Sequence, residues 1–560
     1  MFPECAESPE VKSRKLYYIG PMFSRPLYPT LLFVLVLAIA GLAQQGPVET
    51  DHPVYPFLRR QAARGNLSQN WLAIQPLSWQ QVNTCLTRLD HPALPLSALD
   101  QQLLKRFRAE FAIPTLPTPV TAPWQLHNWR KAGQGLFSGN PNISSYPHGF
   151  TYRDSVAAVW ADWREGLRFQ HNGDQSRGFY SDQLTFHGFL NERLSFYWDF
   201  IQYRLSNVSQ YPDLPPEYKQ GHIIDQEELD WYVWNLGQAG LYATFPNWSF
   251  TLAQQPVYWG YSPGLSPILN TNVYPYTYLS FSVNYKVLRF TTIQGGLLPE
   301  NPSEFNKDIP DKRIAAQRIS VDFSPRLTLA FNEFEIYARR PFEPGYLVPI
   351  IFYWAEENLL GDRDNLLMAV DGIYRLAPGF QIYGTFFWDE LDWFELNKDS
   401  WKNKFAPQLG IFSSLPFESI SGDLRIEYTA VHPWTYTHDD SLNNFASAGI
   451  GLGFPYGPNS AVLDVQSNLW FSPRLSLFLD WTWLRKGSGL GSDVLDNYAE
   501  RDESLDHKTT SLMGTITSNY LGTVQVRYRV NPMVEITGRF ETVRGDTAHN
   551  LWELGLHLDW

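Results

Sequence analysis

The feature that most constrains this chain is an alternation of apolar and polar side chains that recurs over about 400 residues. The stretch 475–483 reads LSLFLDWTW, and 524–530 reads VQVRYRV. A period of two is that of a β-strand, whose successive side chains point to opposite faces. A soluble sandwich also alternates but rarely over such a length, whereas a membrane barrel turns its apolar face to lipid and its polar face to the lumen. We therefore expect a transmembrane antiparallel β-barrel over 153–560.

The connections between these strands follow the pattern of an outer-membrane barrel. Short turns are expected at 190–193, 245–247, 284–286, 324–326, 376–379, 415–419, 471–474 and 530–533. Long loops are expected at 172–179, 206–228, 256–276, 297–315, 339–363, 390–405, 432–458, 486–508 and 544–549. They alternate and predict about 18 strands, provided that 153–171 is one strand and 443–455 lies in a loop. Short turns are typical of the periplasmic side and long loops of the outside.

The N-terminus resembles a secretory signal. The apolar run 31–42, LLFVLVLAIAGL, is too short for a membrane helix, which needs about 20 residues. Small residues follow it, so we expect cleavage between Ala43 and Gln44, and Met22 is the expected start. Residues 1–43 are thus interpreted as an N-terminal extension and signal peptide, and the mature chain is expected in the outer membrane of a Gram-negative-type bacterium.

Residues 44–113 have a helical period instead. Ser78 caps one predicted helix, and Ser97 with Asp100 resembles a capping box before another. A proline-rich linker, 114–152, then leads to the barrel. Because the apolar face of these helices needs a partner, we expect this periplasmic segment to lie under the barrel mouth and help to close it.

The C-terminus is a further strand, LWELGLHLDW, that ends at the aromatic Trp560. Such an ending resembles the signal that outer-membrane barrels present to the barrel assembly machinery. Outer-membrane lipid and this machinery are therefore expected partners.

The order of several segments resembles the capsule-assembly (Wzi) outer-membrane family. The segments are HPVYPFLRRQAARGNL at 52–67, QPVYWGYSPGLSPILNTN at 255–272, AAQRISVDFSPRLTLAFNEFEIYARR at 315–340, DNLLMAVDGIYRL at 364–376, IEYTAVHPWTYTH at 426–438 and YGPNSAVLDV at 456–465. The resemblance implies an 18-stranded barrel that binds capsular or other surface polysaccharide and helps to assemble or anchor it at the cell surface. Ser262 and Pro267 depart from the family pattern, which leaves the identity of the glycan open.

Other classes of function lack a basis in the sequence. The net charge of −13 argues against a nucleic-acid partner, which would need a basic face. The chain contains no GxSxG, HExxH, phosphate-binding glycine loop or clustered Cys/His metal site. His438-Asp439-Asp440 is interpreted as solvated loop or glycan-binding residues. We therefore expect neither an enzyme nor a bound metal or cofactor.

Polar and aromatic residues of the long loops are the candidates for binding a glycan. They are Trp259, Tyr261, Asn270, Trp393, Glu395, Trp434, Tyr436 and His438. The rings could stack on sugars, or they could pack loops against one another to close the outer mouth, and both uses need the same amphipathic surface. Arg485 and Lys486 could add positive charge for an acidic glycan.

Charged residues on the opposite phase of the strands are predicted to face the lumen. They are Asp199, Asp389, Glu427, Asp464, Asp480, Arg527, Arg529, Glu535, Arg539 and Glu541. Both signs occur, so these residues could pair into a ladder that fills the barrel, or line an open pore. The alternative function is therefore an outer-membrane diffusion porin.

Overall fold

The computed structural model describes most of the chain beyond residue 45. The described residues are 46–112, 124–126, 148–154, 157–173, 175–190, 193–207, 222–226, 231–299, 311–392, 394, 400–415, 417, 419–506, 511–546 and 548–559. The predicted cleavage site at Ala43 and Gln44, and Trp560, lie outside these residues. Within the described ranges no helix has the length and apolar character needed to cross a membrane.

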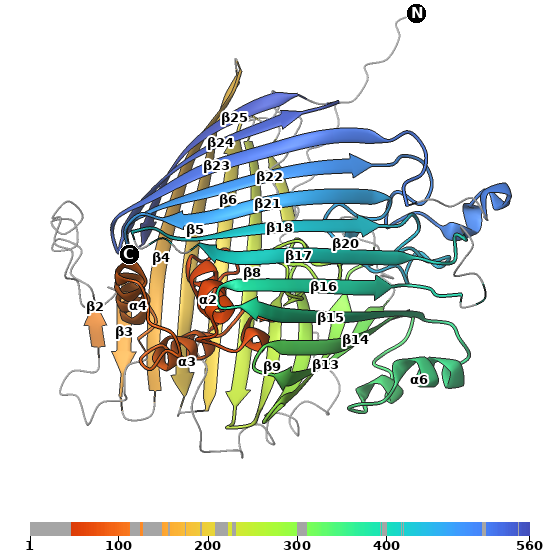
Figure 1. Ribbon diagram of the computed structural model, residues 1–560, viewed down its shortest axis with the longest axis horizontal. Helices are drawn as coiled ribbons and strands as arrows, with labels where there is room; N and C mark the ends of the chain where they lie inside the picture. The colour runs from red at the N-terminus through yellow and green to blue at the C-terminus, as the bar shows by residue number, and fades with distance from the viewer. Residues whose placement is uncertain are drawn as a thin grey trace, which may run out of the picture. The chain divides into compact units, whose positions relative to one another are not determined.

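Eighteen antiparallel strands form a closed barrel, as the sequence predicts (Figure 1). They are β4 (Ala157–Asn172), β5 (Gln175–Leu190), β6 (Leu194–Ser206), β8 (Trp231–Thr244), β9 (Trp248–Gln255), β11 (Tyr276–Tyr285), β12 (Leu288–Leu297), β13 (Lys312–Ser324), β14 (Leu327–Ala338), β15 (Asn365–Ala377), β16 (Phe380–Trp388), β17 (Phe405–Leu415), β18 (Ser421–Val431), β21 (Ser460–Trp470), β22 (Leu475–Lys486), β23 (Thr517–Asn531), β24 (Val534–Arg544) and β25 (His549–Asp559). The last strand, β25, pairs with β4 and closes the barrel.

Three short strands extend this sheet. Strand β3 (Phe150–Arg153) pairs with both β4 and β2 (Trp124–Leu126), and β7 (His222–Gln226) pairs with β8. Parts of the stretch expected to be a linker, 114–152, are therefore strands of the sheet.

The barrel turns its apolar face outward. Strands β22 and β23 pair with Trp481 opposite Gly522 and Leu479 opposite Val524. Trp481 and Val524 are exposed on the wall, as is Leu554 of β25. A membrane barrel satisfies its backbone groups between strands and offers such side chains to lipid, which explains why the alternation is sustained.

The connections agree with prediction except at 172–179, at Arg153, which belongs to β3 while β4 begins at Ala157, and at 206–228, where β7 lies within the expected loop. All eight expected short turns join neighbouring barrel strands. The loop expected at 172–179 is instead a tight turn between Asn172 and Gln175, because β4 and β5 pair along their whole lengths. Residues 443–455 do lie in a loop, where they form the small hairpin of β19 (Ala446–Ser447) and β20 (Ile450–Gly451).

Three helices precede the barrel among the residues that the structure describes. They are α2 (Val54–Arg64), α3 (Trp79–Arg88) and α4 (Ala98–Glu110), with a 3-10 helix, η1, at Gln69–Leu72 and a short strand, β1, at Ile74–Gln75. Ser78 and Gln81 form a full capping box at α3, whereas Ser97 makes only its own half of one, by accepting from the backbone N–H of Asp100. Apolar side chains of the three helices share one core, which includes Trp470 of β21.

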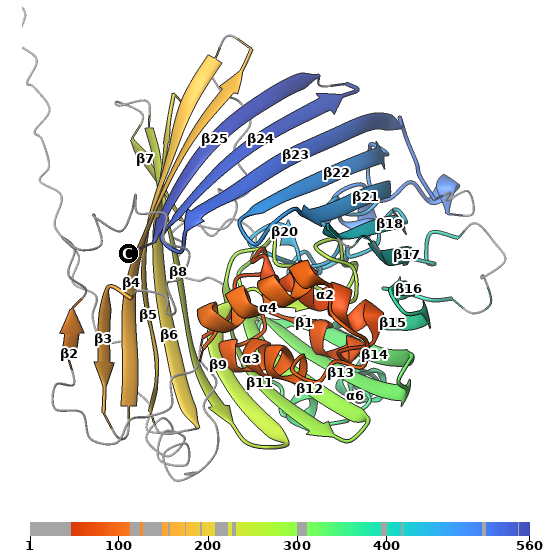
Figure 2. The same cartoon turned by 60° about the vertical axis from the view of Figure 1, so that its left-hand side comes forward.

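This helical segment lies inside the barrel at the end of the short turns (Figure 2). Helix α2 contacts β16, β17 and β18. Its Ala63 carbonyl accepts from the N–H of Gly379, in the turn between β15 and β16, at 2.9 Å. Arg106 of α4 donates to the carbonyl of Pro473, in another short turn, at 2.7 Å. We refer to residues 46–112 as the plug.

The loop between β14 and β15 folds over the outer wall. Phe334 and Ile336 of β14 belong to the lumenal core, so Glu335 and Tyr337 point outward. The ring of Tyr337 packs 5.5 Å from that of Tyr346 in the loop, which carries helix α6 (Tyr353–Leu360). Polar residues of the outer wall are therefore covered by protein at this place.

Candidate functional site

The lumen beside β11 to β18 is filled by two long loops. The first, between β9 and β11, contains β10 (Tyr258–Trp259), which pairs with β1 of the plug. Trp259 is completely buried, and its ring lies 5.5 Å from that of Phe334. The second loop, between β18 and β21, contributes Phe445 and Leu452 to the same core. The plug and both loops thus meet within the barrel.

Two further residues predicted to bind a glycan, Tyr261 and Asn270, stabilise the first loop. Tyr261 is buried against Ala63 of the plug and Phe412 of β17. Asn270 donates through its side chain to the carbonyl of Gly264 at 3.0 Å and accepts from the N–H of Asn272 at 2.8 Å. These residues shape the loop.

In the second loop the predicted glycan-binding residues Trp434 and Tyr436 are likewise used to hold the loop in place. Trp434 and Tyr436 have positive φ angles of 69° and 75°, so the backbone is held in a tight conformation there. The hydroxyl of Tyr436 donates to the carbonyl of Pro267 at 2.8 Å, which joins the two loops. The indole of Trp434 lies against Gly491, where an added Cβ would be 2.7 Å from the ring.

His438 lies at the margin of this loop. Its Nδ1 is 2.9 Å from a carboxylate oxygen of Asp439, and its ring meets Tyr498 edge to face at 5.7 Å. Burial lowers the pKa of His438, although Asp439 opposes this shift.

The described aromatic candidates are therefore buried by loop packing. Trp259, Tyr261, Trp434 and Tyr436 offer no ring face to a sugar in this conformation, because neighbouring loops and strands cover them. Of the two uses expected for these rings, the structure shows that all four pack loops against one another and against the barrel. Trp393 and Glu395 lie outside the described residues.

Sequence reasoning missed a group of exposed aromatic residues. Phe342, Phe352 and Trp354 are exposed on the loop between β14 and β15, and Phe394 is almost fully exposed. The rings of Phe352 and Trp354 lie 6.0 Å apart. The apolar run LVPIIFYW at 347–354 was the available signal, because it predicts an apolar surface in a segment outside the alternating strands.

Five of the predicted lumenal charges are held by side-chain or backbone partners. Glu427 and Asp464 both pair with Arg425, and the hydroxyl of Tyr383 donates to Glu427 at 2.6 Å. Asp389 accepts from the backbone N–H of Tyr436. Asp199 accepts from Gln183 at 3.0 Å, and Asp480 lies close to Asp464. Glu427 and Asp464 are thus in ion pairs, as the ladder interpretation expects, whereas the partners named for Asp199, Asp389 and Asp480 are uncharged groups or another carboxyl group.

The remaining five charges lie along β23 and β24, where the lumenal face is wetter. Arg527 lies 3.1 Å from Glu535, and Arg539 also pairs with Glu541. These four side chains are 22–37% exposed. Arg529 instead reaches Glu110 of the plug at 3.5 Å. Burial opposes ionisation of Glu110, but Arg529 and His52 outweigh it and hold its pKa well below the usual range.

Two buried ion pairs of the lumen were not predicted. Arg318 of β13 donates to both oxygens of Asp371 of β15 at 2.7 and 2.8 Å. Arg60 of α2 donates to Asp423 of β18 at 3.2 Å. The sequence shows Arg318, Asp371 and Asp423 as polar positions of alternating strands. It does not show that Arg60 of the plug lies next to Asp423.

Comparison with solved structures supports the fold described above. No protein-family model matches the sequence, and no curated protein matches it. A solved structure with a similar fold is Wzi of Escherichia coli, an outer membrane protein involved in group 1 capsule assembly and described as a carbohydrate-binding β-barrel. The two share 14% identity with a TM-score of 0.56, over 93% of this chain and 99% of that one.

Two solved structures from Pseudomonas aeruginosa, the outer membrane protein OpdK and OprD, match less well. OpdK has 9% identity and a TM-score of 0.41, over 72% of this chain and 98% of its own. OprD has 10% identity and a TM-score of 0.38, over 72% of this chain and 95% of its own. The likeness to Wzi shows that the chain has the fold of an outer-membrane β-barrel.

Proposed function

We propose that this protein is an outer-membrane barrel that binds a surface polysaccharide and helps to anchor it at the cell surface, without catalysing a reaction. The observation that carries this proposal is the filled half of the lumen, where the plug and two inward loops form one packed interior with β11 to β18. A barrel built for rapid diffusion gains nothing from such packing. A barrel that binds a ligand at its outer surface gains from this packing, because the packed interior holds the surface loops rigid.

The outer surface is then the end that carries the long loops. Short turns of outer-membrane barrels are periplasmic, which would put the plug in the periplasmic mouth and the long loops outside. The exposed rings of Phe342, Phe352 and Trp354 belong to one of these long loops, and in this proposal they stack on sugars. The role predicted for Trp393 and Glu395 remains part of this proposal.

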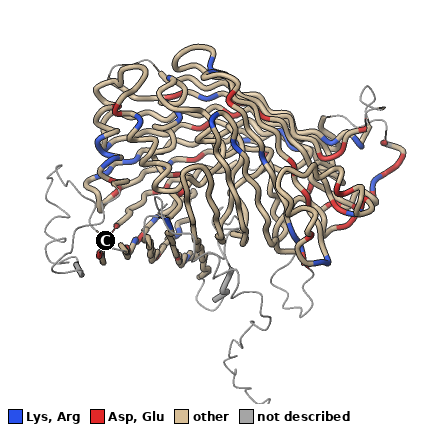
Figure 3. The backbone as a smooth tube through the Cα atoms, turned by 90° about the horizontal axis from the view of Figure 1, so that it is seen from below, with Lys and Arg blue, Asp and Glu red and all other residues tan. Residues whose placement is uncertain are grey.

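The charge of the loops favours a glycan of low negative charge. Figure 3 shows Asp and Glu gathered toward the end of the long loops. The stretch 487–506 alone carries six acidic residues against Arg501. Lys486 is not free to offset them, because its ammonium donates to the carbonyls of Tyr456, Pro458 and Ser492. Repeats of a long polysaccharide would strengthen weak single contacts.

The second candidate function, a diffusion porin, has one observation in its favour. The exposed pairs Arg527–Glu535 and Arg539–Glu541 give one side of the lumen a charged, water-accessible lining. Charged lumenal residues of this kind tune selectivity in open barrels.

A binding experiment separates the two functions. Detergent-purified protein is tested for retention of the surface polysaccharide extracted from the bacterium that makes it. Replacing Phe352 and Trp354 with alanine removes two stacking contacts of about 0.5–1.5 kcal/mol each and should weaken binding about tenfold. Trp552→Ala, which removes an exposed ring of the barrel wall, is the matched control and should leave binding unchanged. Absence of binding by the parent protein, together with a large steady ion conductance, would favour the porin.

A further inference from the structure

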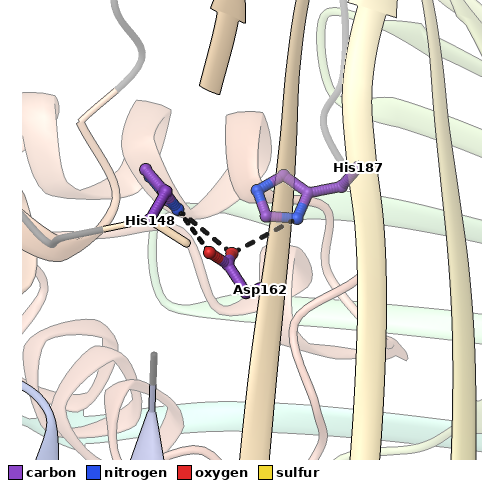
Figure 4. A group of neighbouring side chains, drawn as sticks. All are labelled: His148, Asp162 and His187. Carbon is purple, nitrogen blue, oxygen red and sulfur yellow. Dashed lines mark hydrogen bonds and ion pairs between the residues drawn. The ribbon is translucent and has the colours of Figure 1, made fainter. Parts of the chain in front are cut away.

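Two histidines and one aspartate meet where the chain enters the barrel (Figure 4). His148 precedes β3, Asp162 lies on β4, and His187 lies on β5. Strand β4 pairs with β25 only from Arg164 onward, and with β3 before that point. The cluster therefore lies next to the point on β4 at which pairing with β3 ends and pairing with the last strand, β25, begins.

The three side chains present their ligand atoms to a common point. Nδ1 of His148 lies 3.0 Å from one carboxylate oxygen of Asp162 and 3.1 Å from the other. Nδ1 of His187 lies 4.0 Å from the nearer of these oxygens, and all three ligand atoms lie within 4.8 Å of one another. Ligands of a tetrahedral zinc ion with bonds of about 2.0–2.1 Å stand roughly 3.3 Å apart. The 4.0 Å between Nδ1 of His187 and Asp162 exceeds this separation by about 0.7 Å, and the 4.8 Å that bounds the whole set exceeds it by about 1.5 Å, so the ligands would draw together by up to about 1.5 Å around the ion.

The surroundings hold these ligands in place. The ring of His187 stacks on Trp160 at 5.3 Å and lies 5.4 Å from Trp79 of the plug. The backbone N–H of Gly149 donates to Asp162 at 3.3 Å, which orients the carboxylate. Neighbours that orient ligands in this way are a usual part of metal sites.

The charge near the cluster is also compatible with a cation. Arg164, two residues from Asp162 on β4, is the nearest positive side chain on that strand. Its guanidinium is directed to Glu49 at 2.9 Å and to Asp559 at 3.2 Å. His148 and Asp162 are each nearly one-fifth exposed, so an ion can reach them.

We propose that His148, Asp162 and His187 bind one divalent transition-metal ion, with zinc the best match to two imidazoles and a carboxylate. Three protein ligands leave one position for water. The ion would fasten the segment that enters the barrel to the first two barrel strands, beside α3 of the plug. This inference is independent of the proposed glycan-binding function.

Metal content provides the test. The full chain is purified through a tag without histidine, stripped with EDTA, incubated with a small excess of Zn²⁺, dialysed against metal-free buffer and measured by mass spectrometry of the metal. We expect one zinc per chain, and a Co²⁺-loaded sample should show the visible absorption of a tetrahedral nitrogen–oxygen site.

Matched variants identify the ligands. His187→Ala and Asp162→Asn should reduce zinc to background, and His148→Gln should do so while keeping a hydrogen-bonding group beside Asp162. His171→Ala is the control, because His171 lies on the same strand β4 but bonds to Ser176. Each variant is first shown to be folded by its heat-modifiable migration on gels. A parent chain without zinc, or folded His148→Gln protein that keeps its zinc, would overturn the proposal and leave an ordinary His–Asp hydrogen bond.

Discussion

The ion pair between the plug and the wall gives the sharpest energetic prediction. Arg60 of α2 and Asp423 of β18 are both buried, with 3.2 Å between Nη1 and the carboxylate. Removing one partner of a buried pair costs about 3–5 kcal/mol, because the other charge is left without compensation. Asp423 keeps two hydrogen bonds from Asn468, at 3.0 and 3.1 Å. We therefore expect Arg60→Met to cost about 3 kcal/mol, the lower end of that range.

Hydrogen exchange of the α2 amides measures this cost directly. A loss of about 3 kcal/mol should speed exchange about 100-fold, if α2 exchanges by leaving the wall. Arg64→Met is the control on the same helix, since Arg64 is 26% exposed, lies 3.6 Å from Asp100 and donates to the carbonyl of Pro95, and it should cost less than Arg60→Met because water can reach its guanidinium. Arg60→Met combined with Asp423→Asn should recover most of the loss, because no charge is then buried alone. Equal exchange in the two single variants, or no recovery in the double variant, would refute the reasoning.

Three further predictions concern the loops and the plug. Gly491→Ala should loosen the outer loops, seen as faster proteolysis, because the new Cβ meets the Trp434 ring at 2.7 Å and φ is 86°. Burial, reinforced by Asp362 and Asp364, raises the pKa of Glu357 in α6 from 4.5 to about 8. The stability that this carboxyl contributes is complete below pH 4.5 and is lost as the pH rises through 8, so protease sensitivity of the loop should increase from pH 6 to 9 in the parent but not in Glu357→Gln. Burial raises the pKa of Cys85 in α3 to about 12, so this thiol should resist maleimide until the plug is unfolded by denaturant.

The barrel could be predicted from the sequence because the alternation that defines its strands is visible within each short segment of the chain. Apolar and polar side chains must alternate wherever one face meets lipid, and 475–483 obeys this rule without help from distant residues. One exception is β14, where Glu333 and Glu335 stand in the outward phase. They are buried beneath the loop that carries α6, a tertiary contact that no strand pattern contains.

The interior was less predictable, since it depends on which segments fold inward. Trp259 and Tyr436 lie in loops and so resembled surface residues, yet both are buried in the lumen. The same amphipathic rings serve packing and sugar stacking, and only the path of the loop decides between them. Likewise, the sequence places His148 and His187 39 residues apart, and only the pairing of β3, β4 and β5 brings them together.

Single-channel conductance tests the central claim, that this barrel is closed and serves as a binding surface. The intact chain in a planar bilayer is compared with a variant that lacks the plug, residues 46–112, and that is shown to insert by heat-modifiable migration. We predict little current through the intact protein and a large, steady current once the plug is removed. A large conductance of the intact protein that deletion leaves unchanged would contradict the account and identify an open pore.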